Sequence, residues 1–215
     1  MQTPAPPYPP ATSYPLTFRV DYPDKPLDRV TTFFRFLWII PILVIATLLT
    51  SGTIGIEAND NTWSWATVGV LFLPLVLMIL FRQKYPRWWF DWNLQLTRFL
   101  ARIWVYAALL RDEYPSTDEE QAVHLDFPYP DASRLSRGLP LVKWLLALPH
   151  YIVLLFLWIG ALVCVIIAWF AILFTGRYPQ TLFNYVVGVQ RWSLRVNAYA
   201  FLLITDQYPP FSLSE

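Results

Sequence analysis

Three long runs without a formal charge restrict the fold of this chain more than any other feature of its sequence. They span residues 36–56, 61–81 and 144–176. Each of the first two is long enough to cross a hydrocarbon core of about 30 Å as one α-helix. The third would be roughly 50 Å long as a single helix, which is too long for one comfortable crossing. We therefore predict a tight hairpin over residues 139–175 with a turn near Gly160, although the sequence leaves open whether this segment crosses once or twice.

Composition and charge place the chain among membrane proteins. It is 56% hydrophobic and 14% charged, whereas soluble domains have about 25% charged residues. Residues 57–62, between the first two runs, contain two acids and no base, and basic residues flank the outer ends of both runs. By the positive-inside rule, we predict a multi-pass protein with both termini in the cytoplasm. The net charge of +1 gives no reason to expect a nucleic-acid partner.

The second half of the chain repeats part of the first. When residues 85–110 are aligned with residues 178–203, nine of the 26 positions are identical, against about two expected from composition. The segment VDYP at residues 20–23 also resembles LDFP at residues 125–128. We therefore predict an all-α membrane protein of two tandem repeats, each a transmembrane helical hairpin followed by an interfacial amphipathic helix.

The predicted domain boundaries follow from these patterns. A proline-rich tail covers residues 1–18, and a polar linker at residues 116–133 separates the two repeats. The first repeat covers residues 19–115 and contains a hairpin at about 36–56 and 61–81 and an amphipathic helix at about 87–111. The second repeat covers residues 134–215 and contains a hairpin at about 139–175 and an amphipathic helix at about 180–204.

Each repeat is predicted to close with a helix that carries arginines on one face. Polar residues recur in both segments at spacings of three and four, which places them on one helical stripe. A crossing helix would bury two arginines at about 2.5 kcal/mol or more each, so both helices are predicted to lie in the membrane interface. The residues predicted to bind a lipid headgroup or a membrane partner are Arg98, Arg102, Tyr106, Arg191, Arg195 and Tyr199. The alternative is that these arginines extend to the aqueous boundary with their stems in the apolar layer, or pair internally with Asp91, Asp112 or Asp206.

Tryptophan and tyrosine are concentrated in and around the two amphipathic segments. Their rings are apolar but carry a polar N–H or O–H group, so they favour the headgroup region. Eight of the 12 tyrosines directly precede a proline, which indicates corners where the chain leaves a helix. The predicted interfacial anchors are Trp88, Trp89, Trp92, Trp104, Tyr178, Trp192 and Tyr208.

Motifs for catalysis or metal binding are not found in the sequence. It has no glycine-rich phosphate loop, nucleophile elbow or zinc-binding motif. Cys164 is the single cysteine, so an internal disulfide is excluded. His150, beside Pro149, could ligate a haem or chlorophyll or relay protons, but the sequence has no second helix-borne histidine to pair with it. A hydrogen-bonded role in the core or at an interface is preferred. We therefore expect no cofactor and lean against an enzyme.

The C-terminal stretch WFAILFTGRYPQTLFNYVVGVQRW, which begins at Trp169, and its continuation to Leu213 carry a family resemblance. From roughly Arg137 onward, the chain resembles an uncharacterised bacterial family of multi-pass membrane proteins, catalogued as a domain of unknown function (four-three-eight-nine). The resemblance implies a protein of the bacterial inner membrane, and it brings no catalytic residues with it.

Three functions fit these observations. The preferred one is a non-enzymatic scaffold or accessory subunit that binds lipid headgroups or a membrane partner through its two arginine-bearing helices. A small transporter or lipid-handling carrier with a site at the repeat interface is the first alternative. A membrane subunit that holds a cofactor near His150 is the second.

Overall fold

Helices dominate the structure, and two short strand pairs accompany them. The computed structural model describes residues 14–50, 53–56, 63–117 and 119–214. Within these ranges the elements in chain order are β1 (Thr17–Val20), α1 (Arg29–Trp38), α2 (Ile40–Thr50), β2 (Thr53–Ile56), β3 (Trp63–Ala66), α3 (Thr67–Arg82), α4 (Arg87–Ala107), β4 (Val123–Asp126), α5 (Leu139–Leu146), α6 (Leu148–Thr175) and α7 (Gln180–Ala200). The predicted tail lies mostly at residues 1–13, and the predicted link between the first two crossings lies mostly at residues 57–62, both outside the described residues.

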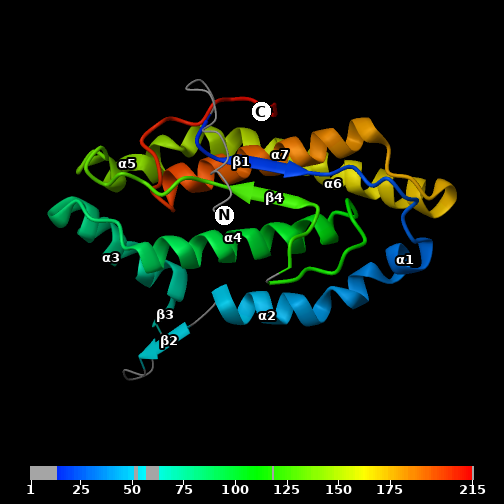
Figure 1. Cartoon of the computed structure of the whole chain (residues 1–215), viewed down its shortest axis with the longest axis horizontal. Coiled ribbons are helices and arrows are strands. Elements are labelled where there is room, and N and C mark those ends of the chain that lie inside the picture. The colour runs from blue at the N-terminus through cyan, green and yellow to red at the C-terminus, as the bar shows by residue number, and fades with distance from the viewer. Residues whose placement is uncertain (1–13, 51–52, 57–62, 118, 215) are drawn as a thin grey trace, which may run out of the picture.

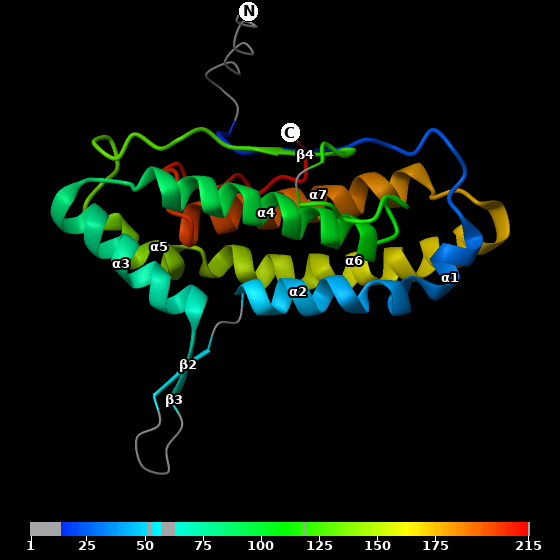
Figure 2. The same ribbon diagram turned by 60° about the horizontal axis from the view of Figure 1, so that its bottom comes forward.

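The elements lie in layers along the long axis of the molecule. Figure 2 shows β1 and β4 on one side, α4 and α7 beneath them, and α1, α2, α5 and α6 on the opposite side. Figure 1 shows the same long helices running side by side, with α3 at one end. The largest group of buried side chains joins β1, β4, α4, α6 and α7. The strands β2 and β3 form a hairpin that projects from the α2 and α3 end, on the same side as α2 and α6 (Figure 2).

The two similar segments VDYP and LDFP lie in and directly after a strand pair. β1 and β4 are antiparallel, with Phe18 opposite Leu125 and Val20 opposite Val123. The side chains of Phe18 and Leu125 are 1% and 4% exposed, because both point into the layer of α4 and α7. The prediction of an all-α fold is therefore wrong, since a pair of strands joins the first and second halves of the chain.

The first predicted hairpin does not exist. α1 and α2 are bent by 40° at Ile39, and α2 reaches only Thr50, where the prediction had a crossing at residues 36–56. Pro41 explains the break, because proline has no backbone N–H to continue the helical ladder. The predicted crossing at residues 61–81 contains β3 and the 16-residue α3, which is about 24 Å long and too short for the hydrocarbon core.

The second predicted hairpin is wrong as well, because α6 runs without a turn through Gly160. The backbone at Gly160 is helical, and its role is close packing: a Cβ there would lie 2.6 Å from the hydroxyl oxygen of Tyr185 on α7. The helix ends at Gly176, which has the left-handed φ of 72° that favours glycine. The prediction of two tandem transmembrane hairpins is therefore replaced by two layers of long helices and a strand pair.

Among the described residues, α5 and α6 together form one helix, Leu139–Thr175, that is long and apolar enough to cross a membrane. A second would count only if the bent pair of α1 and α2 formed one span. Just 17% of the most apolar stretch of the first helix is buried, which is unlike the core helix of a soluble protein. The helix supports association with a membrane.

The two amphipathic segments form α4 and α7, which begin at the predicted positions and end four residues earlier than predicted. Both are followed by a leucine in the left-handed conformation, Leu109 with a φ of 62° and Leu203 with a φ of 54°. The chain bends sharply there, and this bend directs Asp112 and Asp206 back towards the layer of α1 and α5.

Candidate functional site

The arginine stripes of α4 and α7 point towards the strand pair. Nε of Arg98 donates to the carbonyl oxygen of Leu125 at 2.9 Å, and Nε of Arg191 donates to that of Phe18 at 2.9 Å. Leu125 and Phe18 face each other in the sheet register, so the two arginines hold the opposite outer edges of β1 and β4. These arginines therefore join the helix layer to the strand layer.

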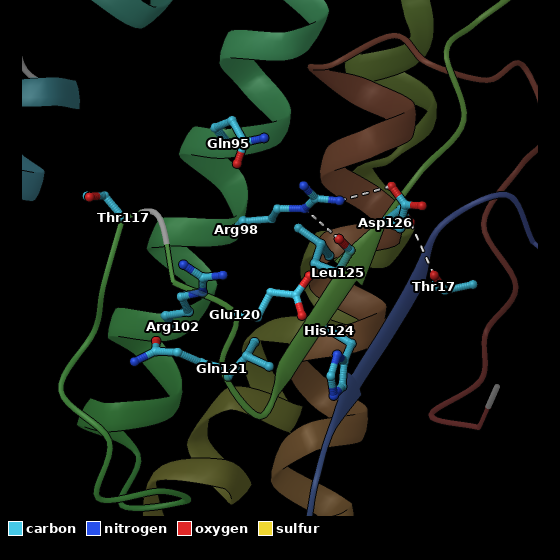
Figure 3. Close-up of a pocket in the computed structure, with 11 residues that line it drawn as sticks. Thr17, Gln95, Arg98, Arg102, Thr117, Glu120, Gln121, His124, Leu125 and Asp126 are labelled. Carbon is cyan, nitrogen blue, oxygen red and sulfur yellow. Dashed lines mark hydrogen bonds and ion pairs between the residues drawn. The ribbon is translucent and has the colours of Figure 1, made fainter. Parts of the chain in front are cut away.

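A polar pocket lies between α4, β4 and the segment that connects them. It encloses about 650 Å³, and Figure 3 shows Gln95, Arg98 and Arg102 projecting into it from α4. The opposite wall is formed by β4 and by the connecting segment, from which Thr117 and Glu120 project (Figure 3). The lining residues are Thr17, Gln95, Arg98, Arg102, Thr117, Glu120, Gln121, Val123, His124, Leu125 and Asp126.

Both arginines of this pocket are held by the protein on one side. Nη2 of Arg98 lies 3.3 Å from a carboxylate oxygen of Asp126, whose side chain is 71% exposed. Nη1 of Arg98 has no hydrogen-bond partner in the part of the chain that the structure describes. Nη1 of Arg102 donates to the carbonyl oxygen of Ser116 at 2.7 Å. Arg98 therefore retains donor capacity towards the pocket.

The corresponding arginines of α7 are covered by the C-terminal segment. Nη1 of Arg191 donates to the carbonyl oxygen of Leu213 at 2.9 Å, and Nη1 of Arg195 donates to that of Ser212 at 3.4 Å. Arg195 is only 3% exposed, and its guanidinium also lies over the ring of Tyr14. Of the four predicted binding arginines, the structure thus brings Arg98 and Arg102 to a pocket and places the other pair against the backbone.

Tyr106 and Tyr199 lie away from the pocket, beneath two ion pairs that the sequence interpretation missed. Arg35 pairs with Asp112 and lies over the ring of Tyr106, 4.2 Å from its centre. Lys143 and Asp206 are joined at 2.7 Å, and the Lys143 ammonium lies 5.1 Å from the ring centre of Tyr199. The predicted alternative paired Asp112 and Asp206 with the arginines of α4 and α7, whereas the structure pairs them with Arg35 and Lys143.

A signal for these two cations exists in the sequence. Arg35 and Lys143 each stand six residues before a proline, Pro41 and Pro149, in the first apolar segment of their half of the chain. Both side chains are almost fully buried, at 3% and 1% exposure. A buried cation at one fixed distance from the helix break could have been expected to need an acidic partner.

The carboxyl group of Asp206 is tuned by its surroundings. Burial opposes its ionisation, but hydrogen bonds from Lys143 and from the backbone N–H of Ser136 more than offset burial and lower its pKa below the usual value. The carboxylate is thus the stable form at neutral pH, and it compensates the charge of Lys143. This pair fixes the segment that follows α7 to α5.

The predicted aromatic anchors divide into exposed and buried groups. Trp88, Trp92 and Tyr208 are exposed, at 68%, 47% and 42%. Trp89 and Trp104 are partly buried against the main core. Tyr178 and Trp192 are buried, at 1% and 5% exposure, and pack inside the protein. The sequence pattern did not separate these roles because tryptophan and tyrosine serve both cores and interfaces.

His150 is a buried packing residue in this structure. Its Nδ1 accepts a hydrogen bond from Nε1 of Trp192 at 3.0 Å, and its ring stacks on Phe211 with 4.0 Å between ring centres. Because the indole N–H can only donate, the neutral imidazole carries its proton on Nε2, and neither nitrogen is left as a ligand. The described residues also contain no group of three or more His, Cys, Asp or Glu residues placed to hold a metal ion.

The side of the molecule opposite the strands is apolar. Large hydrophobic side chains are exposed along α1, α2, α5 and α6, and we call this surface the apolar face. On α6 it comprises Leu148, Ile152, Val153, Leu155, Phe156, Ile159, Leu162, Val163, Ile166, Ile167, Phe170 and Phe174. A patch of this extent is unusual on a soluble monomer and marks a surface that contacts lipid or another protein.

Comparison with known proteins bears on the C-terminal part of the chain. Neither the curated proteins nor the solved structures gave a significant match. One family model does match, and its range contains nearly all of α5, the whole of α6 and α7, and the C-terminal segment as far as Ser212. Residues 140–212 match the model of the family described as "Domain of unknown function (DUF4389)", which confirms the resemblance predicted for the C-terminal half.

Proposed function

We propose that the protein is a non-enzymatic membrane scaffold, seated in one leaflet through its apolar face and exposing the arginine pocket of α4 to a partner. The observation that carries this proposal is the separation of surfaces: large apolar side chains lie along α1, α2, α5 and α6, and the strands and arginine stripes lie on the other side. Such a separation is typical of proteins that lie in the membrane interface.

The packing of α6 against its neighbours favours an orientation parallel to the membrane. α6 is fixed to α7 by hydrogen bonds from Trp158 to Ser193 at 3.0 Å and from Tyr185 to the Leu157 carbonyl at 3.2 Å, and the rings of Trp104 and Trp158 join it to α4. If α6 crossed the bilayer, α4 and α7 would cross beside it. Their arginines and the strand pair would then enter the hydrocarbon core, at a cost of about 2.5 kcal/mol or more for each arginine.

Membrane binding through the apolar face determines which elements of the protein face water. The strands β1 and β4, of which β4 lines the pocket beside α4, and the described end of the C-terminal segment lie away from the apolar face (Figure 2). They would face the aqueous side of one leaflet, which we assign to the cytoplasmic side of a bacterial inner membrane. The β2–β3 hairpin projects from the apolar side, so a bilayer in this position would surround it.

The predicted binding role narrows to Arg98 and Arg102. Arg191 and Arg195 already donate to the backbone of the strand and of the C-terminal segment, which supports a structural role for that pair. Arg98 borders a cavity of about 650 Å³ and keeps one donor directed to it. A transporter site at the interface of the two halves is less well supported, because that interface is filled by the main core.

Liposome flotation tests whether the protein binds membranes through its apolar face. Ile152, Ile159 and Ile166 are 60%, 55% and 49% exposed on α6, and each contributes about 1 kcal/mol when its exposed part enters lipid. The triple variant Ile152→Gln, Ile159→Gln, Ile166→Gln should therefore lower partitioning by about 100-fold or more. The control His124→Gln, on the opposite side, should float like the wild type. Unchanged flotation of the triple variant would refute the seat.

A further inference from the structure

The pocket beside α4 corresponds to a place on α7 that the chain itself fills. Arg98 and Arg191 are equivalent in the sequence alignment of the two halves, and each donates from Nε to a strand carbonyl. On α7, Nη1 of Arg191 also donates a hydrogen bond to the carbonyl oxygen of Leu213, in the C-terminal segment. On α4, Nη1 of Arg98 has no such acceptor among the described residues. In the first half the segment after α4 reaches Arg102 through the Ser116 carbonyl oxygen, as the C-terminal segment reaches Arg195 through Ser212, but it provides no described acceptor for Nη1 of Arg98.

The residue three positions before each arginine shows why the two places differ in shape. On α7 this residue is Gly188, where an added Cβ would lie 2.9 Å from Cβ and 3.0 Å from the carbonyl oxygen of Leu213. On α4 it is Gln95, whose side chain lines the pocket (Figure 3). Because the close contacts include a backbone oxygen, a segment lying over Gln95 would have to run farther from the helix than the C-terminal segment does, and a residue smaller than leucine would reduce that displacement.

The charges of the pocket favour a polypeptide over an anionic headgroup. The positive charges of Arg98 and Arg102 are matched by the carboxylates of Glu120 and Asp126, so a phosphate group would meet two like charges. A peptide backbone carries both donors and acceptors and no charge. The lining offers arginine donors for its carbonyl groups and glutamine and carboxylate acceptors for its N–H groups.

The outer edge of β4 also lines this pocket. The carbonyl group of Leu125 points outward to Arg98, and in an antiparallel pair alternate residues share the same direction. The backbone groups of Val123 therefore point outward as well, into the pocket that this residue lines. Extended peptides commonly bind by adding to such an edge.

We propose that the pocket binds an extended segment of a partner polypeptide, which sets a small residue against Gln95 and a backbone carbonyl oxygen on Nη1 of Arg98. The segment resembles the C-terminal segment of this chain with a small residue in place of Leu213. This inference rests on the proposed scaffold function and specifies how the scaffold holds its partner.

The test uses the full-length protein in mild detergent and two fluorescein-labelled peptides. One is YPPFSLS, the sequence of residues 208–214, and the other is YPPFSGS, in which glycine replaces the leucine. Fluorescence polarisation should show saturable binding of YPPFSGS, with YPPFSLS weaker by about tenfold because of Gln95. The variant Gln95→Gly should bind YPPFSLS about as well as the wild type binds YPPFSGS. Failure of YPPFSGS to bind up to millimolar concentrations would refute the proposal.

Two variants test whether the peptide binds at Arg98 and not elsewhere on the protein. Arg98→Ala should weaken binding of YPPFSGS by about tenfold or more, because a charge-assisted hydrogen bond is lost. Arg134→Ala, at a side chain that is 87% exposed, is the matched control and should bind normally. Binding that is equal in Arg98→Ala and wild type would refute the proposal. It would also fail if glycerol phosphate or anionic vesicles, but not the peptides, depended on Arg98. Flotation is measured separately, so loss of the peptide site and loss of the membrane seat are distinguishable.

Discussion

The Lys143–Asp206 pair gives the sharpest prediction about stability. The Lys143 ammonium lies 2.7 Å from the carboxylate of Asp206 and donates to the carbonyl oxygen of Thr205 at 2.7 Å. Its side chain is 1% exposed, whereas that of Asp206 is 23% exposed. Asp206→Asn keeps the shape of the side chain but leaves a buried ammonium without its counter-charge. Removal of one partner from a fully buried pair costs about 3–5 kcal/mol. Because Asp206 is partly exposed, we expect a loss of about 2–3 kcal/mol in the free energy of unfolding.

The melting temperature in mild detergent, followed by tryptophan fluorescence, measures this loss. For a chain of this length, 1 kcal/mol corresponds to about 2–4 °C, so Asp206→Asn should melt about 4–12 °C lower. Glu113→Gln is the matched control, because Glu113 is 43% exposed and its carboxylate lies 2.7 Å from the guanidinium of Arg111, which is 19% exposed. Loss of this more accessible pair should cost under about 1 kcal/mol. The double variant Lys143→Met, Asp206→Leu should regain most of the stability, because no uncompensated charge remains. Equal melting of Asp206→Asn and Glu113→Gln, or no recovery in the double variant, would refute the reasoning.

Two further predictions concern acid stability and helix packing. Because the pKa of Asp206 is lowered in the folded protein, its contribution is complete above the usual aspartate pKa of about 3.9 and is lost as the pH falls through the lowered value. The difference in melting temperature between wild type and Asp206→Asn should therefore shrink below about pH 4 and stay constant from pH 5 to 8; a difference that grew on acidification would contradict this sign. Gly160→Ala should destabilise the protein, because the new Cβ would lie 2.6 Å from the Tyr185 hydroxyl oxygen. In a Tyr185→Phe background the same change should cost less or stabilise by up to about 1 kcal/mol, since alanine favours helix over glycine; equal effects in both backgrounds would show that this contact is unimportant.

Much of the helical layer that carries the arginines could be predicted from the sequence. The stripes of polar residues located α4 and α7, and the arginine spacing placed Arg98 and Arg102 on one face. The cost of burying these arginines argued against crossing helices. The same patterns could not show that Arg191 and Arg195 are covered, because the hydrogen-bond acceptors are backbone carbonyl groups of Phe18, Ser212 and Leu213. Every residue has such a group, so the sequence does not mark these acceptors, and Phe18 is also distant in the chain.

The apolar segments were misread because hydropathy records composition and not direction. A run of 33 uncharged residues fits a crossing hairpin, a tilted span or an in-plane helix equally well. Gly160 was interpreted as a turn, whereas its missing side chain makes room for Tyr185. The similarity of VDYP and LDFP was visible, but strand pairing over more than 100 residues depends on the helices that bring β1 and β4 together.

The direction of α6 relative to the membrane tests the central claim most directly. Spin labels on single cysteines at positions 152, 159 and 166, in a Cys164→Ser background, would lie seven residues apart on the apolar face. Collision with oxygen and with a water-soluble nickel complex reports the depth of each label in liposomes, and a label at position 124 provides the aqueous reference. The membrane seat predicts one common depth within a single leaflet for all three positions. A depth that changes by about 10 Å from each label to the next would show that α6 crosses the bilayer and would contradict the account.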